Sequence, residues 1–480
     1  MGIFANPLTD LLEYEDFSRD FLKGTDPVGM TGCIDSEKVH FMSTFLGEKK
    51  VQLVVTYNEQ RAREIEEDYK LFCSQVYVIP PRDLIFFSAD LQGNAIIAER
   101  MKAFAALYQN EAKVIITTID ALMSAAVPFE QLMSHVIKLK EGDELDLEKL
   151  KHDLTVMGYE RVGRVEEPGQ FTVHGGIADV YPLTMEVPVR IELWGDEIDT
   201  IRCFEPQSQR SMDQIECVSV FPAAEVIADD TARRRAVGMI QNELESQLAV
   251  FKKAKEPDKA KRLREETNRI LEALGEDVVL EAPDSYISYF YPRTVQLSEY
   301  FDEKNTLVFL DEPMRLKERG DGVQAEFEES MKNRLEQGFL LPGQTALLTP
   351  AKHVLAAFER GQVAALSSLD SRLADFTVVN SYAVNVQNMN TYREGFELLI
   401  KDLTHWKKEK YRIVLLCPSR TRANRIVNQL IEYDLLAYYS EDEDKKINPG
   451  EIMVTYGNLH RGFLYPMLKF AVITESDIFG

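Results

Sequence analysis

Short, almost wholly apolar runs separated by amphipathic stretches are the feature that most restricts the fold of this chain. Examples are Val51–Thr56, Val76–Ile79, Val114–Thr118 and, much later, Thr306–Leu310. Runs of this kind predict strands that are buried on both faces, and the stretches between them predict crossover helices. Asn58 is placed to cap a helix directly after the first run. The predicted fold class is therefore α/β, with a parallel sheet covered by helices.

A β-rich segment interrupts this strand–helix pattern. The runs Val189–Leu193 and Ile198–Phe204 flank Gly195-Asp196, which is typical of a hairpin turn. Farther along, Asp230–Leu274 is a long helical stretch of mixed charge. Mixed signs indicate a solvated helix face, so we give nucleic-acid contact there little weight. The apolar run Ala346–Thr349 predicts one more strand.

These changes of pattern divide the 480 residues into four predicted segments. A degenerate nucleotide-binding-like domain of the helicase (RecA-like) type is expected in two parts, at 1–140 and 226–372. An inserted small β-rich domain is expected at 141–225, and a second small α/β domain at 373–480. The chain stops at Gly480 without a polar tail, which suggests a fragment cut at a domain border.

Composition limits the classes of partner. The net charge is −24, from 79 acidic and 55 basic residues, which argues against DNA as the main partner of the chain. The five cysteines and seven histidines are scattered, so we predict reduced thiols and no metal site. The sequence shows neither a signal peptide nor an apolar run of about 18 residues. We expect a cytoplasmic monomer with no membrane contact.

The eight residues from Gly29 to Ser36 have the length of a phosphate-binding loop, G-x-x-x-x-G-K-[ST], and share its first glycine and its closing serine. An inner glycine, Gly32, is also present. However, Ile34 stands where the second glycine belongs, and Asp35 replaces the lysine that reaches the phosphates. A carboxylate aimed at a polyanion is repelled, at a cost of about 1–4 kcal/mol per like-charge pair at ~4 Å. ATP is therefore not expected to bind.

An acidic pair supports descent from a nucleotide site. Asp311-Glu312 follows the apolar run Thr306–Leu310, where such a pair would hold Mg²⁺ in a working ATPase. Acidic pairs after strands are also common turns, and Gly29–Ser36 taken alone is better explained as an ordinary glycine-containing turn. Together the two elements favour a lapsed ATPase. No cofactor is expected on this chain.

The β-rich segment carries a family resemblance. The stretches Met157–Val162, Glu167–Pro182 and Arg190–Asp199, followed by Gln209-Arg210, closely resemble the inserted domain shared by bacterial excinuclease B and the transcription-repair coupling factors. The resemblance covers essentially the whole chain and is strongest from Met157 to Arg210.

Three features favour the coupling factors over excinuclease B. The phosphate loop is broken, whereas excinuclease B keeps an active one. The segment between Pro80 and Arg100 is too short for the long aromatic-rich hairpin with which excinuclease B grips damaged DNA. The C-terminal stretches Gly457–Phe463 and Ile473–Gly480 look like the third domain of the coupling factors.

The resemblance implies a non-catalytic role in transcription-coupled nucleotide excision repair. In that family the inserted domain docks excinuclease A. The modules that bind RNA polymerase and duplex DNA, and the motor that uses ATP and Mg²⁺, lie downstream of the third domain. The docking face is held shut by the last domain of the full-length protein until the motor engages a stalled polymerase.

Arginines mark the expected docking residues. The chain has no lysine between Lys151 and Lys252, so every permanent cation in that span is an arginine, a residue favoured at interface hot spots. The predicted partner-binding residues are Arg161, Arg164, His174, Arg190 and Arg202. Arg161 matches the docking arginine of the family, whereas His174 stands where the family usually has arginine, which predicts a weaker, pH-dependent contact. The alternative is that these arginines pair with acidic neighbours on the same sheet, among them Glu166, Glu192, Asp196 and Glu197.

Two other functions are weighed against this one. An ATP-dependent DNA translocase or helicase-like enzyme would need an intact phosphate loop. A binder of damaged DNA, like excinuclease B, would need the long hairpin and a less acidic surface.

Overall fold

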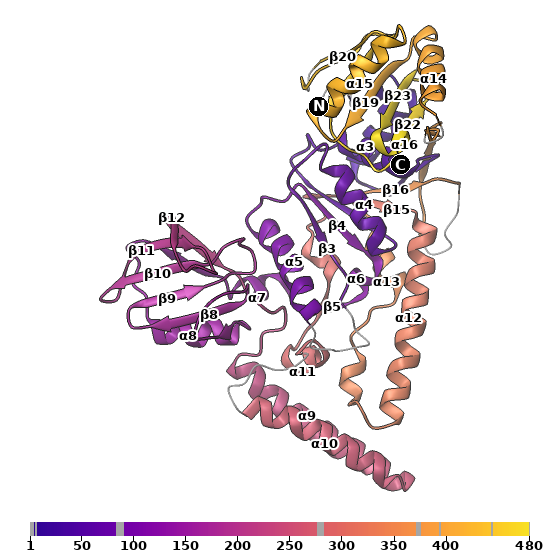
Figure 1. Cartoon of the computed structure of the whole chain (residues 1–480). Helices are drawn as coiled ribbons and strands as arrows, with labels where there is room; N and C mark the ends of the chain where they lie inside the picture. Colours follow the sequence, from indigo (N-terminus) through magenta and orange to yellow (C-terminus); the bar gives the residue numbers. More distant parts are fainter. Residues whose placement is uncertain are drawn as a thin grey trace.

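A seven-stranded parallel sheet forms the centre of the protein, and we call it and its covering helices the sheet domain (Figure 1). The structure, a computed structural model, describes residues 4, 7–82, 91–275, 283–370, 376–392, 395–442 and 445–479. The strand order is β17-β1-β16-β15-β2-β4-β3, and every neighbouring pair is parallel. The strands are β1 (Val28–Thr31), β2 (Val51–Thr56), β3 (Val76–Ile79), β4 (Val114–Thr118), β15 (Thr306–Asp311), β16 (Gln362–Ser367) and β17 (Asn380–Ala383). The predicted α/β class is confirmed.

Helices cover both faces of this sheet because successive strand residues point to opposite sides. In β2, Leu53 and Val55 belong to one core, whereas Val54 belongs to the other. The core on the Val54 side is closed by α2 (Leu12–Lys23), α3 (Asp35–Ser43) and α4 (Glu59–Tyr69). The opposite core is closed by α5 (Leu91–Tyr108), α6 (Ile119–Met123), α7 (Phe129–Met133), α11 (Ile287–Phe290), α12 (Pro313–Glu336) and α13 (Ala351–Ala356). Asn58 caps α4 as predicted, accepting a hydrogen bond from the Arg61 amide.

The predicted strand Ala346–Thr349 is wrong. The segment follows a 3-10 turn (Pro342–Thr345), and its pairing is limited to a single bridge between Leu348 and Ser124. Pro350 comes next and caps α13, and proline has no N–H to donate to a sheet. The apolar run is therefore too confined to extend into a strand.

The inserted domain is a six-stranded sheet that projects to one side of the sheet domain (Figure 1). The chain enters and leaves through a two-stranded antiparallel stem of β6 (Ile137–Lys140) and β13 (Cys217–Val220). The helix α8 (Leu147–Val156) covers one face of the sheet and buries Leu150 and Leu154 in its core. The strands are β7 (Glu160–Arg161), β8 (Gln170–His174), β9 (Ile177–Val180), β10 (Val189–Trp194), β11 (Glu197–Phe204) and β12 (Ser211–Gln214). The predicted hairpin at Gly195-Asp196 joins β10 to β11.

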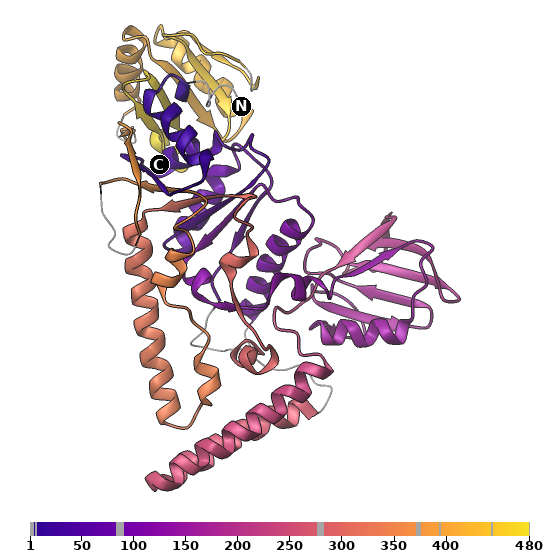
Figure 2. The ribbon, with the colours of Figure 1, turned by 180° about the vertical axis from the view of Figure 1, so that it is seen from behind.

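The stretch Asp230–Leu274 forms two antiparallel helices, α9 (Asp230–Ala254) and α10 (Pro257–Gly275), which we call the helical hairpin. Lys255 adopts a left-handed backbone conformation (φ 60°) and ends α9, while Pro257 opens α10, a position that proline tolerates. Phe251 and Leu263 anchor the hairpin in the core of the sheet domain. The views from the front and from behind both show the turn of the hairpin at the end of the molecule farthest from the C-terminal strands (Figures 1 and 2).

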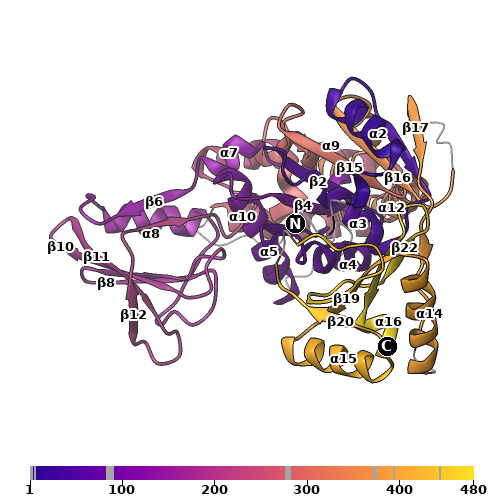
Figure 3. The ribbon, with the colours of Figure 1, turned by 90° about the horizontal axis from the view of Figure 1, so that it is seen from above.

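The C-terminal domain (387–479) is a second, smaller α/β unit, whereas Phe376 and β17 before it still belong to the sheet domain. The predicted boundary at 372/373 falls outside the described residues, as does Gly480. Its sheet order is β18-β22-β23-β19-β21-β20. The strands are β18 (Gln387–Asn388), β19 (Arg412–Cys417), β20 (Ala437–Tyr439), β21 (Ile452–Tyr456), β22 (Phe463–Tyr465) and β23 (Phe470–Thr474). The helices α14 (Phe396–Lys408), α15 (Arg420–Glu432) and α16 (Glu475–Phe479) cover one face (Figure 3).

The other face of this small sheet shares a hydrophobic core with the sheet domain. Phe463, Tyr465 and Phe470 lie in the same cluster as Val39 of α3. A continuous apolar interface of this kind fixes the C-terminal domain on α3 and α4. Among the described residues, no helix combines the length and apolar character needed to cross a bilayer.

Candidate docking face and remnant nucleotide site

The predicted phosphate loop joins the end of β1 to the start of α3, which is the strand–turn–helix context that such a loop requires. The peptide at Gly32 has φ +84°, and a Cβ there would lie 2.0 Å from the carbonyl oxygen of Val384. The Val384 amide in turn donates a hydrogen bond to the Thr31 carbonyl. Protein backbone therefore covers the glycine at which a working loop would admit phosphate.

A buried lysine, Lys38, lies one helical turn beyond Ile34. Its Nζ donates to Asp311 Oδ1 at 2.7 Å and to Glu312 Oε1 at 2.6 Å. The side chain of Lys38 is 4% exposed and that of Asp311 is 2% exposed, so this ion pair is shielded from water. The acidic pair predicted from sequence thus has an internal cation as its partner.

A second cation and a hydroxyl complete the cluster. Arg61 Nε lies 3.4 Å from Asp311 Oδ2, and Thr56 Oγ1 donates to the same oxygen at 2.8 Å. Burial alone would raise the pKa of Asp311, but the charges of Lys38 and Arg61 outweigh it and hold the pKa at about 2. The carboxylate therefore stays ionised and fully paired. Sequence reasoning missed both cations; the available signal was a lysine within a helix whose other positions are mostly apolar or small.

A loop of the C-terminal domain lies over the same site. The Arg461 amide donates to Ser36 Oγ at 2.9 Å, and the Arg461 guanidinium is 3.5 Å from the Asp35 carboxylate. The His460 amide donates to Asp68 Oδ1 at 2.5 Å. Asp35 and Ser36, both predicted as remnants of the nucleotide site, thus serve as contacts between domains.

Three titratable groups are buried where these domains meet. Burial raises the pKa of Glu37 to about 7, even though Tyr465 Oη and the Ile34 amide donate hydrogen bonds to it. Burial likewise raises the pKa of Asp68 to about 6, and it lowers the pKa of His40 to about 4. All three groups are consequently neutral over part of the range in which they would be charged in water.

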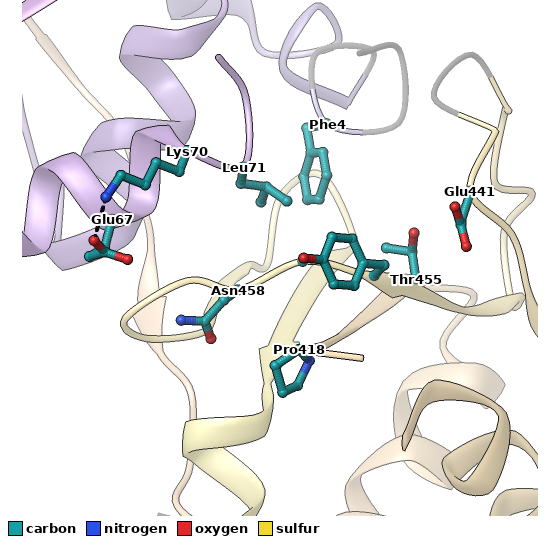
Figure 4. Close-up of a pocket in the computed structure, with 10 residues that line it drawn as sticks. Phe4, Glu67, Lys70, Leu71, Pro418, Glu441, Thr455 and Asn458 are labelled. Atoms are coloured by element: carbon teal, nitrogen blue, oxygen red, sulfur yellow. Dashed lines mark hydrogen bonds and ion pairs between the residues drawn. The ribbon is translucent and has the colours of Figure 1, made fainter. Parts of the chain in front are cut away.

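A cavity of about 400 Å³ lies beside this contact (Figure 4). Leu71 and Phe4 line it on one side, and Pro418 and Asn458 belong to the C-terminal domain. Its charged groups already have partners: Lys70 binds Glu67, and Glu441 accepts from Arg420. The cavity therefore offers no free charge to a ligand.

Three of the predicted partner-binding residues share the face of the inserted sheet that lies opposite α8. Strand register pairs His174 with Ile177, and Arg190 with Arg202. Neighbouring residues in register point to the same side of a sheet. On this open face Ile177 is 40% exposed, and Trp194, at the end of β10, is 84% exposed. Trp194 was not predicted as a site residue, although its place beside a hairpin turn indicated exposure.

The arginines of the inserted domain differ in their partners. Arg190 binds Asp179 through two hydrogen bonds of 2.8 and 2.7 Å and stacks on Phe204, so it stabilises the sheet itself. Arg164 lies 3.2 Å from Glu166, one of the acidic neighbours considered above.

The two remaining arginines are less constrained. Arg161 is exposed on the edge strand β7 and forms no ion pair with the described residues. Arg202 is half-buried, and its Nε has no hydrogen-bond partner in the described part of the chain. These two, together with the exposed His174, are available to a partner.

Two parts of the chain match known protein families. The UvrB interaction domain family matches residues 137–225, and the MFD D3 domain family matches residues 405–478. The chain is 28% identical to the transcription-repair-coupling factor of Bacillus subtilis strain 168 over 480 residues, which is 99% of this chain and 40% of that protein. It is 27% identical to the factor of Staphylococcus epidermidis RP62A over 483 residues and 28% identical to that of Staphylococcus haemolyticus over 479 residues, covering 40% and 39% of those proteins.

The chain spans about two fifths of the length of the curated relatives that it matches. The inserted domain coincides with the first family match, and β19 to β23 lie within the second. Along essentially its whole length, the chain is similar to the N-terminal region of the transcription-repair-coupling factors.

Proposed function

We propose that this chain is a non-catalytic recruitment module of transcription-coupled nucleotide excision repair, and that its inserted domain docks excinuclease A. The match of residues 137–225 to the UvrB interaction domain carries this proposal. In a full-length protein, the module that binds RNA polymerase and the motor that moves along duplex DNA would lie beyond the segments that this chain spans.

The open face of the inserted domain suits protein docking on physical grounds. It combines an exposed indole, Trp194, with an exposed aliphatic side chain, Ile177, the guanidinium of Arg202 and the imidazole of His174. Aromatic and arginine side chains dominate interface hot spots because they bury a large area and form directional hydrogen bonds. Arg161 lies at the edge of the same sheet, on strand β7, in register with the core residue Phe171.

Replacement of Arg161 with alanine is expected to weaken the binding of excinuclease A by about 1–3 kcal/mol, the range of an interface hot spot. Arg161 has no ion pair with the described residues, so its removal leaves the fold intact. Isothermal titration of the purified chain with excinuclease A measures the change.

Arg19→Ala is the matched control, because Arg19 is an exposed arginine on α2, outside the inserted domain. It should bind like the wild type. Equal affinities for wild type and Arg161→Ala would place the docking face elsewhere. Absence of binding by the wild type would refute the recruitment function.

We also propose that the nucleotide site of the sheet domain is lapsed. Three features support this: the Lys38 ion pair occupies the acidic residues, the Val384 backbone covers Gly32, and the Arg461 loop engages Ser36. A translocase or helicase-like activity of this chain is therefore opposed by contacts as well as by the broken motif. The long hairpin of a damage binder would fall within Pro80–Arg100, part of which (83–90) is outside the described residues.

Restoring the motif should not restore nucleotide binding. The double variant Ile34→Gly/Asp35→Lys recreates the loop consensus, but the covering backbone and the Lys38–Asp311 pair are unchanged. Neither this variant nor the wild type is expected to bind a fluorescent ATP analogue with Mg²⁺ at about 1 mM, where even weak sites of about −4 kcal/mol are half-filled. Saturable binding by the wild type would contradict the lapsed site; binding by the variant alone would show that the motif, and not the covering, excludes ATP.

A further inference from the structure

The turn of the helical hairpin is the most basic part of this acidic protein. Residues 252–264, which we call the hairpin tip, contain seven basic and two acidic residues in a chain of net charge −24. In the sequence the basic residues fall in two runs, one on each side of Pro257. The antiparallel packing of α9 and α10 brings the two runs together at one end of the molecule (Figure 2).

Basic side chains line a groove at the tip. A hollow of about 550 Å³ lies between the two helices, with Lys252 and Lys255 on the α9 side and Lys261 and Arg264 on the α10 side. Two acidic residues, Glu256 and Glu265, also line it, and both form ion pairs with lysines of α10. Asn268 extends its polar lining along α10. Cations from both helices therefore face one shared space.

Five of these seven cations have no acidic partner among the described residues. Lys259 lies 2.6 Å from Glu256, and Lys261 lies 3.8 Å from Glu265. Arg262 stacks on Phe339 and donates to the Gln337 carbonyl, which braces the tip against the end of α12. The exposed cations that form no ion pair with described residues are Lys252, Lys253, Lys255 and Arg264.

The macrodipole of α9 does not account for this charge. Lysines in a last turn stabilise a helix C-terminus, but the N-terminus of α10, with the opposite dipole, begins within three residues of that end. Two antiparallel dipoles largely cancel, so one lysine would suffice there. The C-terminal turn of α14 carries the similar run Lys407, Lys408 and Lys410 without a second basic helix beside it, and it is a natural comparison.

The mixed charge of Asp230–Leu274 as a whole gave nucleic-acid contact little weight, but at its tip basic residues outnumber acidic ones by seven to two. We propose that the hairpin tip binds the phosphodiester backbone of duplex DNA. Lysine ammonium groups act as mobile point charges that follow a line of phosphates without reading bases. Residues 252–264 contain no aromatic side chain, and the neighbouring Phe339 already has Arg262 stacked on its ring. An unpaired base therefore finds little to stack on at the tip, which favours a double helix over a single strand. Elsewhere the net negative charge repels a polyanion, so contact is confined to the tip.

The test is fluorescence anisotropy of a labelled duplex of about 25 base pairs titrated with the whole chain from about 50 to 200 mM salt. The triple variant Lys252→Gln/Lys253→Gln/Lys255→Gln should lower the affinity at least about tenfold at the low-salt end. The slope of log K against log salt should become shallower by about 1 for each phosphate that the variant no longer neutralises.

The control is Lys407→Gln/Lys408→Gln/Lys410→Gln, which removes the same charge from the end of α14 and should bind like the wild type. Thermal unfolding checks that both variants are folded. If both variants lose the same affinity, the loss reflects only the change in net charge, and the proposal is overturned. It is also overturned if the tip variant binds the duplex as tightly as the wild type. If polyglutamate displaces the labelled duplex as effectively as unlabelled DNA does, the partner of the tip is an acidic protein and not DNA.

Discussion

Replacement of Lys38 with methionine is expected to lower the free energy of unfolding by about 3–5 kcal/mol. The substitution keeps the length of the side chain but leaves Asp311 and Glu312 with one buried cation fewer. An uncompensated buried carboxylate carries a large desolvation penalty, of which Arg61 offsets only a part. Urea unfolding followed by Trp406 emission, in a Trp194→Phe background, reports the transition of the C-terminal domain that packs on α3.

Lys102→Met is the matched control for this prediction. The Lys102 ion pair with Glu186 is exposed, with side-chain exposures of 40% and 87%, so its loss should cost less than about 1 kcal/mol. If both variants unfold at the same urea concentration, the ion pairs of Asp311 do not stabilise the fold as strongly as their burial implies.

Replacement of Glu37 with glutamine is expected to remove a pH dependence of stability of about 3 kcal/mol. The pKa of Glu37 is about 7 in the folded protein, against an ordinary value of 4.5. Between these values the folded state holds a proton that the unfolded state has released. Stability from this group is therefore greatest at low pH and falls as the pH rises through 7. Glutamine does not titrate, so the difference in unfolding free energy between variant and wild type should change by about 3 kcal/mol from pH 4.5 to 7.5.

Subtracting the unfolding free energies of the variant and the wild type at each pH removes the contributions of the other titrating groups. Asp68, with a raised pKa of about 6, adds a trend of the same sign, and His40, with a lowered pKa of about 4, adds the opposite trend. Both groups are present in the wild type and in the variant, so their contributions cancel in the difference. Parallel pH profiles would show that Glu37 is ionised in the folded protein across this range.

Local signals in the sequence predicted most of the regular structure. The strands β2, β3 and β4 have the predicted bounds, because a short apolar run bounded by polar residues specifies a buried strand from neighbouring residues alone. The cap of α4 was likewise local, with Asn58 accepting from the amide three residues ahead. Ala346–Thr349 failed because tertiary confinement overrode a weak apolar signal.

The candidate sites depended on contacts that no local pattern contains. Lys38 and Asp311 are 273 positions apart, and Ser36 meets the Arg461 amide across 425 positions. Sequence reasoning identified both remnants of the nucleotide motif but not the groups that satisfy them. In the inserted domain it named Arg190 and Arg161 together, and only strand register separates the arginine that holds the sheet from the one on its edge.

The strand order of the central sheet sets the timing of folding during synthesis. β1 pairs with β16 and β17, so its edges stay open until more than three hundred further residues have been made. At about 5–20 residues per second this interval lasts about 15–70 s. The inserted domain pairs its strands within a single short segment and can complete its sheet as soon as it leaves the ribosome. A nascent chain therefore presents a folded inserted domain beside an incomplete central sheet whose strand edges are unpaired and whose apolar surface is exposed. Intermediates of this kind are bound by chaperones.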